Sequence, residues 1–247
     1  MRYVGSKNRI SKELTPIIHS YINDNCKGYI EPFVGGANMI DKIKCINKIG
    51  YDNNPYLIAL LNHVKLTTDD IPEEITREHY YYVKNNQSKY DEWYVGLVGF
   101  CGSFSAKFWG GYATNGNNPK YKKTPFNESR NNIIKQSVNL KDIKFECKDY
   151  KDLDNLSGYV IYCDPPYKNK LAYQSKFNHE EFYDWVRKMS VNNIVLVSEY
   201  DMPDDFECIW KKDILCQVSR QNKTKTNDSI RRNEKLIILK NGIKSLS

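Results

Sequence analysis

A short apolar strand that runs straight into two glycines is the feature that most restricts how this chain can fold. Residues 29–34 read Tyr-Ile-Glu-Pro-Phe-Val, and Gly35 and Gly36 follow, whose missing side chains permit a tight turn. We expect residues 37–44 to form a helix and residues 49–52 to form a second strand that ends in an acid. A strand, a glycine loop, a helix and a second strand, in this order, open a doubly wound α/β sheet.

Strands and helices are predicted to alternate along most of the remaining chain. An amphipathic helix is expected over residues 11–22, with Pro16 inside it, and another begins near Pro55 and carries apolar residues at helical spacing. The predicted fold is therefore α/β, with an antiparallel pair as its last two strands. The remaining expected elements are helices over residues 71–98 and 179–189 and strands over residues 143–147, 159–163, 193–198, 206–218 and 235–239.

Residues 99–132 interrupt this alternation. They contain glycines at 99, 102, 110, 111 and 116 and prolines at 119 and 125, with aromatic residues and lysines between them. Because Gly and Pro break regular structure, we interpret this stretch as an irregular, partly β insertion. The chain is accordingly divided into a sheet domain, residues 1–66 and 133–247, and an inserted helical and β domain, residues 67–132.

Composition excludes several classes of protein. The chain has 247 residues, 40% of them hydrophobic and 27% charged, values near globular averages that exclude wholesale disorder. Because it has no run of eighteen apolar residues and no apolar N-terminal segment, we expect no membrane span and no signal peptide, and a cytoplasmic location. None of the seven cysteines has Cys-x-x-Cys spacing and the four histidines are scattered, so no metal site is predicted.

Positive charge is concentrated in two regions. Residues 99–150 hold nine Lys/Arg against four Asp/Glu, and residues 211–240 hold nine against three, within a net charge of +7. Such clusters are typical of a polyanion partner, although each lysine alone is more simply a solvated surface charge. The candidate phosphate-binding residues are Lys107, Lys122, Lys123, Arg130, Lys223, Lys225, Arg231 and Arg232.

The tetrapeptide Asp164-Pro165-Pro166-Tyr167 directly follows the apolar strand 159–163. It therefore lies at the carboxyl end of the predicted sheet, where ligands bind in open α/β folds. The two prolines remove backbone donors and leave an acceptor-rich rim beside an aromatic ring. An exocyclic amine on a flat ring can donate both hydrogens to these acceptors while the ring stacks on Tyr167. The alternative is a turn that merely ends a strand.

Two further segments have the residue types of a nucleotide or cofactor site. Asp52, which ends the second strand, can accept hydrogen bonds from ribose hydroxyls, or it can cap the helix that begins near Pro55. The glycine pair lacks the third glycine of the dinucleotide fingerprint, so a nicotinamide enzyme is not indicated. Near the N-terminus, Tyr3-Val4-Gly5-Ser6-Lys7 forms either an ordered binding loop or a solvated end with a surface lysine.

In this order, the Tyr-x-Gly-x-Lys segment, Pro-Phe-x-Gly-Gly, an acid after strand two and Asp-Pro-Pro-Tyr resemble the Dam-like DNA adenine-N6 methyltransferases. The resemblance spans residues 1 to about 170. The stretch 99–112 departs from the Asn/Arg-rich recognition element of many members, so the recognised base sequence is not predicted.

The resemblance implies a Rossmann-like, S-adenosylmethionine-dependent methyltransferase sheet with an inserted DNA target-recognition region. It implies site-specific methylation of adenine N6 in double-stranded DNA. A cognate restriction endonuclease is a possible partner, and the chain is expected to be a monomer. It also places residues 145–150 beside the adenine ring of the cofactor. By position, the catalytic residues are Asp164, Pro165, Pro166 and Tyr167, and the cofactor-binding residues are Tyr3, Lys7, Pro32, Phe33, Gly35, Gly36, Asp52 and Asp164.

Other functions remain open at this point. The acceptor amine can belong to adenine in RNA, and a catalytically silent DNA-binding module would keep the basic regions without the reaction. An unrelated nucleotide-binding α/β enzyme would explain the sheet and the glycine loop, but not Asp-Pro-Pro-Tyr.

Overall fold

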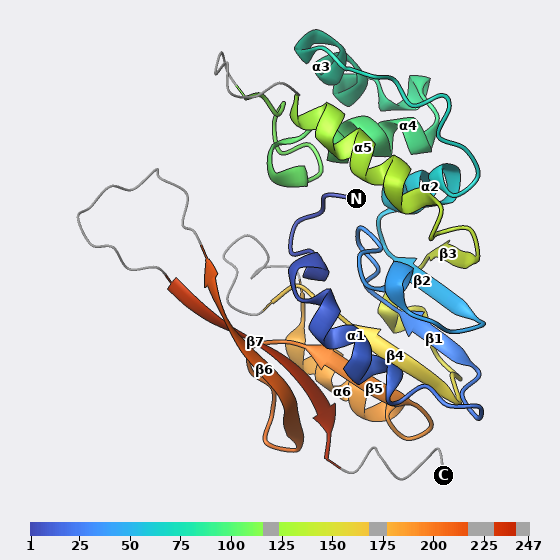
Figure 1. Ribbon diagram of the computed structural model, residues 1–247, viewed down its shortest axis with the longest axis vertical. Coiled ribbons are helices and arrows are strands. Elements are labelled where there is room, and N and C mark those ends of the chain that lie inside the picture. Colours follow the sequence, from blue (N-terminus) through green and yellow to red (C-terminus); the bar gives the residue numbers. More distant parts are fainter. Residues whose placement is uncertain (116–123, 168–176, 217–229, 241–247) are drawn as a thin grey trace. The chain divides into compact units, whose positions relative to one another are not determined.

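The computed structural model describes residues 1–115, 124–167, 177–216 and 230–240 (Figure 1). The chain divides into two compact units, Met1–Leu153 and Asp154–Ser247.

A seven-stranded mixed sheet has the strand order β3-β2-β1-β4-β5-β7-β6. The pairs β1·β2, β2·β3 and β4·β5 are parallel, whereas β7 is antiparallel to both β5 and β6. The order of the first five strands is that of the doubly wound fold, so the predicted Rossmann-like α/β class and the antiparallel final pair are confirmed. The strands are β1 (Gly28–Glu31), β2 (Lys48–Asp52), β3 (Ile143–Cys147), β4 (Tyr159–Cys163), β5 (Ile194–Ser198), β6 (Phe206–Cys216) and β7 (Ile230–Leu239).

In unit 1, two helices adjoin the sheet segments as the sequence predicts. Helix α1 (Ser11–His19) buries Leu14 and Ile18 and begins before Pro16, which lies inside it. Helix α2 (Pro55–Val64) has proline at its first position and buries its apolar face, which comprises Leu57, Ile58, Leu60, Leu61 and Val64.

The predicted helix over residues 37–44 is wrong. A single 3₁₀ turn, η2 (Ile40–Lys42), replaces it, because Ala37 has a φ of 56° and Gly35 a φ of 48°, which no right-handed helix allows. Gln136 Nε2 donates to the carbonyls of Gly36 and Ala37 at 3.2 and 2.9 Å. A side chain about a hundred residues away thus satisfies backbone groups that a local helix would otherwise use.

Residues 71–98 form two short helices where the sequence predicts one. Thr76 caps α3 (Arg77–Asn85), the 3₁₀ turn η3 (Gln87–Lys89) interrupts the chain, and α4 (Glu92–Gly96) then runs into the π-helix η4 (Leu97–Cys101). Among the described residues that follow, an isolated bridge joins Ser103 to Tyr112 beside the 3₁₀ turn η5 (Phe104–Ala106).

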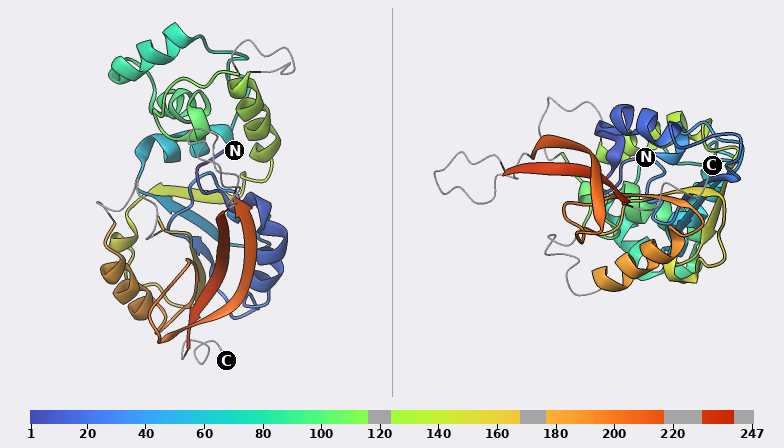
Figure 2. Two further views of the ribbon diagram at one scale, coloured as in Figure 1. Left: turned by 90° about the vertical axis from the view of Figure 1, so that its left-hand side faces the viewer. Right: turned by 90° about the horizontal axis from the view of Figure 1, so that it is seen from below.

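Helix α5 (Pro125–Ser137), capped by Thr124, replaces the irregular chain expected up to residue 132. A Thr cap followed by Pro at the first helical position is a helix-start pattern, which the many Gly and Pro residues upstream obscured in the sequence. Within unit 1, helices α2–α5 gather on one side of strands β1–β3 (Figure 1 and the left panel of Figure 2).

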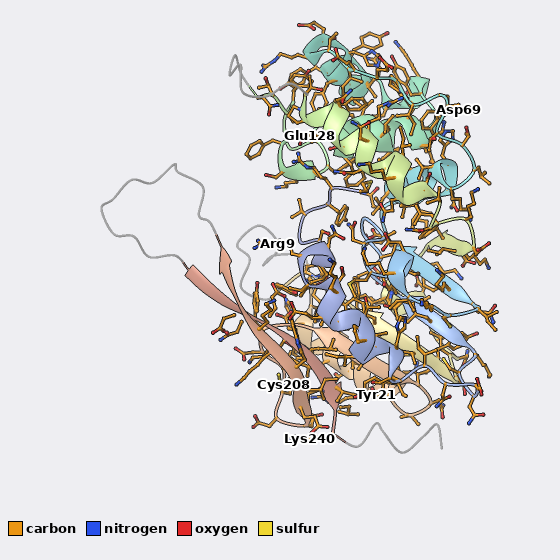
Figure 3. All side chains as sticks on the ribbon, in the orientation of Figure 1. Arg9, Tyr21, Asp69, Glu128, Cys208 and Lys240 are labelled. Atoms are coloured by element: carbon orange, nitrogen blue, oxygen red, sulfur yellow. The ribbon has the colours of Figure 1, made fainter. Side chains whose placement is uncertain are left out.

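Unit 2 has a buried parallel pair and a long antiparallel pair. All of β5 is buried, as are Val160–Cys163 of β4, and the amphipathic helix α6 (His179–Met189) is capped by Asn178. The antiparallel strands β6 and β7 pair from Phe206 with Leu239 onward, with an irregularity between Cys208 and Trp210. Cys208 and Lys240 mark this end of the strand pair in Figure 3.

Two predicted absences concern only the described residues. None of their helices is long and apolar enough to cross a bilayer. No group of three or more metal-ligating side chains occurs in the same part of the chain.

Candidate cofactor and catalytic sites

In unit 1, the carboxylate of Asp52 fixes the glycine loop that follows β1. Its Oδ2 accepts the N–H of Gly35 at 3.2 Å, and its Oδ1 accepts the N–H of Asn54 at 3.0 Å. Burial raises the pKa of Asp52 from 3.8 to about 6, against the opposing effect of these backbone donors. Any ligand that donates further hydrogen bonds to this carboxylate favours its ionised form.

The alternative interpretation of Asp52 as a helix cap is wrong. Helix α2 is capped by Asn54, whose Oδ1 accepts the N–H of Leu57 at 3.1 Å. Asp52 instead bonds to the backbone before the helix begins, at the carboxyl end of β2 where the prediction placed a ribose-binding acid.

The ring of Tyr3 lies directly on the glycine loop. A Cβ atom added to Gly35 would lie 2.7 Å from Cε1 of Tyr3, and one added to Gly36 would lie 2.8 Å from Cβ of Tyr3. The Tyr3 ring also lies 5.7 Å from that of Phe100, centroid to centroid. The structure therefore brings together three residues that the sequence assigned to one site, and it explains why both loop positions are glycine.

Lys7 is a buried residue. Its side chain is 5% exposed, and Nζ lies 3.4 Å from the carbonyl oxygen of Gly5, to which it donates. Gly5 has a φ of 81°, and Ser6 Oγ accepts the N–H of Asn8 at 3.2 Å, so this N-terminal segment is an ordered turn. The alternative of a solvated surface lysine is wrong.

The segment after β3 completes the surroundings of Asp52. The N–H of Lys148 donates to the carbonyl of Asp52 at 3.1 Å, and Asp149 Oδ2 accepts from Nδ2 of Asn53 at 3.3 Å. The rings of Phe33 and Tyr150 are 5.3 Å apart. Asp149 and Tyr150 belong to the segment 145–150 that the resemblance placed beside the cofactor, whereas sequence reasoning did not single out Asn53, whose position directly after Asp52 was the available signal.

In unit 2, the catalytic candidates follow β4 without a gap. Asp164 is half-buried, Pro165 and Tyr167 are buried, and Pro166 is half-buried. The tetrapeptide lies outside any helix or strand, directly after the β4·β5 register, which ends where Cys163 pairs with Val197.

Tyr167 has two partners in unit 2 that the sequence did not reveal. Its hydroxyl donates to Oε2 of Glu234 at 2.8 Å, and its ring lies 4.5 Å from that of Tyr200 at an angle of 60°. Burial, reinforced by the negative charges of Asp164 and Glu234, raises the pKa of Tyr167 well above 10. Tyr167 is therefore a neutral phenol, and its hydroxyl keeps the proton that it donates.

The family model of the D12 class N6 adenine-specific DNA methyltransferases matches residues 3–191. The chain belongs to this family. The match includes both the glycine loop of unit 1 and the Asp-Pro-Pro-Tyr segment of unit 2. The family's methyl donor is S-adenosylmethionine.

Two curated relatives of this D12-class chain are named type II methyltransferases. M.FokI from Planomicrobium okeanokoites is 23% identical over 220 residues, which are 77% of this chain and 32% of that protein. M.MjaIII from Methanocaldococcus jannaschii is 27% identical over 226 residues, 74% of each chain. The chain therefore spans about a third of the length of M.FokI and about three quarters of M.MjaIII.

Two solved structures align with most of this chain at TM-scores below 0.5. The rRNA methyltransferase aviRa from Streptomyces viridochromogenes has a TM-score of 0.44 and 9% identity, over 96% of this chain and 86% of that one. SMU.472, described as a putative methyltransferase complexed with SAH, has a TM-score of 0.33 and 11% identity, over 94% and 53% of the two chains.

The residues of unit 1 fit the methyl donor of the D12 class. The carboxylate of Asp52 is a group that can accept hydrogen bonds from ribose hydroxyls, and Gly35 and Gly36, on which Tyr3 packs, contribute no side chains that would obstruct a ligand. Phe33, with Tyr150 beside it, offers an apolar ring surface for a flat base.

The predicted DNA-binding residues of the D12-class chain are only partly described. Lys107 is exposed, whereas Arg130 donates through Nε to the carbonyl of Ile71 at 3.3 Å and so also ties α5 to the chain before α3. Lys122, Lys123, Lys223 and Lys225 lie outside the described residues, and Arg231 and Arg232 are described only as backbone positions of β7.

Proposed function

We propose that this chain transfers the methyl group of S-adenosylmethionine to N6 of adenine at a specific sequence in double-stranded DNA. The observation that carries the proposal is the Asp164–Tyr167 segment, which follows a buried parallel strand in a chain of the D12 class. The two type II relatives support a site-specific reaction.

Asp164 and Pro165 act on the amine in this proposal. The Asp164 carboxylate and the Pro165 carbonyl accept the two N6 hydrogens, and neither proline has an N–H that would compete for these acceptors. Holding both hydrogens directs the nitrogen lone pair out of the base plane, and positioning of this kind supplies much of the rate. Methylation of the amine requires its nitrogen to give up one proton, and the Asp164 carboxylate, which would already accept a hydrogen bond from that nitrogen, would receive it.

The other predicted site residues bind the two substrates. Tyr3, Lys7, Pro32, Phe33, Gly35, Gly36 and Asp52, together with Asp164, hold the cofactor, which supplies an electrophilic methyl group when bound. Tyr167 stacks on the adenine, and Pro166 fixes the backbone between Pro165 and Tyr167.

Methylation requires the target adenine to leave the base stack, at a cost of a few kcal/mol. Phosphate contacts made by the two basic clusters would offset this cost. The inserted residues 67–132 would recognise the target sequence. The enzyme is proposed to act as a monomer in the cytoplasm, and a restriction endonuclease that cuts the same sequence is its proposed partner.

Plasmid DNA from a methylation-free host that expresses this chain tests the proposal directly. Single-molecule sequencing should find N6-methyladenine at one short motif, and plasmid from a host expressing Asp164→Ala should be unmodified. Unmodified DNA from a chain shown to bind S-adenosylmethionine would contradict the proposal. Methylated adenine in the RNA of the same cells would then assign the reaction to RNA.

A further inference from the structure

In unit 2, the hydroxyl groups of two tyrosines, Tyr167 and Tyr200, both donate to the carboxylate of Glu234. Glu234 Oε2 accepts the Tyr167 hydroxyl at 2.8 Å, and Oε1 lies 3.5 Å from the Tyr200 hydroxyl, which donates to it. The rings of Tyr167 and Tyr200 are in edge contact at 4.5 Å. Each pair of these three residues is therefore in direct contact.

Strand register explains why these residues converge. In the parallel pair of β4 and β5, Cys163 lies opposite Val197, and in the antiparallel pair of β5 and β7, Ser198 lies opposite Leu236. Tyr200 lies two residues beyond Ser198, past the end of β5. Glu234 lies two residues before Leu236, inside β7, where it pairs with Lys212 of β6 and lies just beyond the register shared with β5. The meeting point is therefore set by three strands of the sheet (Figure 1).

The Glu234 carboxylate restrains the Tyr167 ring through the hydrogen bond to its hydroxyl group. A tyrosine ring rotates about two side-chain bonds, and a hydrogen bond at the hydroxyl combined with a ring contact along its edge restricts both rotations. Because the pKa of Tyr167 is raised well above 10, its hydroxyl remains a donor to Glu234 over the whole working pH range.

We propose that Glu234 and Tyr200 are positioning residues for methyl transfer: they set the plane of the Tyr167 ring, and through it the plane of the adenine that stacks there. This inference rests on the proposed function and extends it to residues 200 and 234, which lie beyond the stretch 3–191 matched by the family model. Glu234 acts through Tyr167 and has no role of its own in the transfer of the methyl group or the proton.

A neighbouring ion pair provides the matched control. Lys235 Nζ lies 3.0 Å from Asp201 Oδ1, so this pair joins β7 to the residue after Tyr200 just as Glu234 does, but with side chains that are 28% and 84% exposed. If Glu234 only stabilised β7, loss of this ion pair through Asp201→Ala would have a comparable effect on the reaction.

The test measures the single-turnover rate of methylation on duplex DNA with saturating S-adenosylmethionine. Glu234→Ala should lower this rate about 10- to 100-fold, the range expected for a misplacement of about 1 Å, and change the Kd values for cofactor and DNA by no more than about twofold. Glu234→Gln, which keeps one acceptor oxygen, should restore part of the rate, and Asp201→Ala, which removes the exposed acid of the control ion pair, should stay within about twofold of wild type.

A double-mutant cycle separates positioning from general damage. Tyr167→Phe removes the hydroxyl donor but keeps the ring, and adding it to Glu234→Ala should cause little further loss of rate. The fluorescence of 2-aminopurine in place of the target adenine should rise on binding to wild type and change in intensity in Glu234→Ala, because the extruded base stacks on a reoriented ring.

The possible failures are distinguishable. If the wild-type chain methylates adenine but Glu234→Ala is equally fast, or if the losses from Tyr167→Phe and Glu234→Ala multiply, this inference is wrong and the proposed function stands. If the wild-type chain methylates no adenine, both are wrong. If a thermal unfolding assay shows that Glu234→Ala does not fold, the double-mutant cycle is measured with Glu234→Gln and Tyr167→Phe instead.

Discussion

At the scale of single residues, two acids of the molecule have contrasting surroundings. The carboxylate of Asp52 accepts two backbone N–H groups and yet has a raised pKa, because burial outweighs those donors. Asp164 is half-buried beside Tyr167, whose phenol stays neutral. Asp52 is therefore tested through the pH dependence of cofactor binding, and Asp164 through the rate of methyl transfer.

Asp52 should make cofactor binding depend on pH. Its folded pKa of about 6 means that it is ionised above this value and protonated below it. Because ribose hydroxyls donate to the ionised form, the affinity for S-adenosylmethionine should be highest above about pH 7 and fall as the pH drops through 6. Isothermal titration from pH 5 to 8 measures this. Asp52→Asn should bind weakly and without the pH-dependent step, and an unchanged step in that variant would assign the titration to another group.

Asp164 should be required for the reaction and dispensable for binding. Asp164→Ala should abolish methyl transfer, because one acceptor of the amine is lost, while the Kd for duplex DNA stays within about threefold of wild type. Radiolabelled methyl transfer and a gel-shift titration measure the two quantities. Full activity in this variant would remove Asp164 from the proposed site.

At the scale of helices and strands, the sheet was predictable and the connection between β1 and β2 was not. Short apolar runs bounded by polar residues indicated all seven strands of the described residues, but the first half of β7 was missed, because the strand begins at Ile230 and the prediction began at residue 235. The connection failed because its backbone groups bond to Gln136 of α5, a contact that no local pattern contains. The same limit applies to the site: Asp164–Tyr167 was visible as a contiguous motif, whereas Glu234 reaches Tyr167 only through strand pairing.

The connection should depend on that one glutamine. Gln136→Leu leaves the carbonyls of Gly36 and Ala37 buried without their side-chain donor, which should cost about 2–3 kcal/mol of unfolding free energy. Urea unfolding of this variant should be compared with Lys135→Ala, an exposed position on the same helix. Equal stability of the two variants would show that the connection holds its shape without Gln136.

The start of α2 offers a second test at this scale. Asn54→Ala removes the cap that accepts the N–H of Leu57 and should cost about 1 kcal/mol, whereas Asn54→Asp keeps an acceptor there and should cost less. Thermal unfolding of both variants measures the difference. A loss of the same size in both would mean that the amide group, and not the cap, stabilises this turn.

At the scale of the whole molecule, charge rather than shape governs the expected encounter with DNA. Each phosphate contact releases condensed counterions, so the logarithm of the binding constant falls with the logarithm of salt concentration by about 0.9 per contact. The basic region 211–240 carries nine Lys/Arg against three Asp/Glu, which makes it a principal source of this dependence.

Removing two of these charges should reduce the salt dependence in proportion. The double variant Lys223→Ala and Lys225→Ala should flatten the slope by about 2 if both residues contact phosphates. Fluorescence anisotropy of labelled duplex from about 50 to 200 mM salt measures it. Lys12→Ala is the control, because Lys12 is an exposed residue of α1 and lies outside both basic regions. An identical slope in the double variant and the control would exclude these two lysines.

The hydrogen bond between Tyr167 and Glu234 spans 67 residues of sequence, and this separation has a consequence for synthesis in the cell. The ribosome completes the glycine loop and the Asp-Pro-Pro-Tyr segment long before it adds β7. A nascent chain, or one cut short by a frameshift within the last strands, would possess both motifs while the ring of Tyr167 still turned freely. The final strand would therefore act as a check on completeness, so that partial products remain poor catalysts and do not mark the genome.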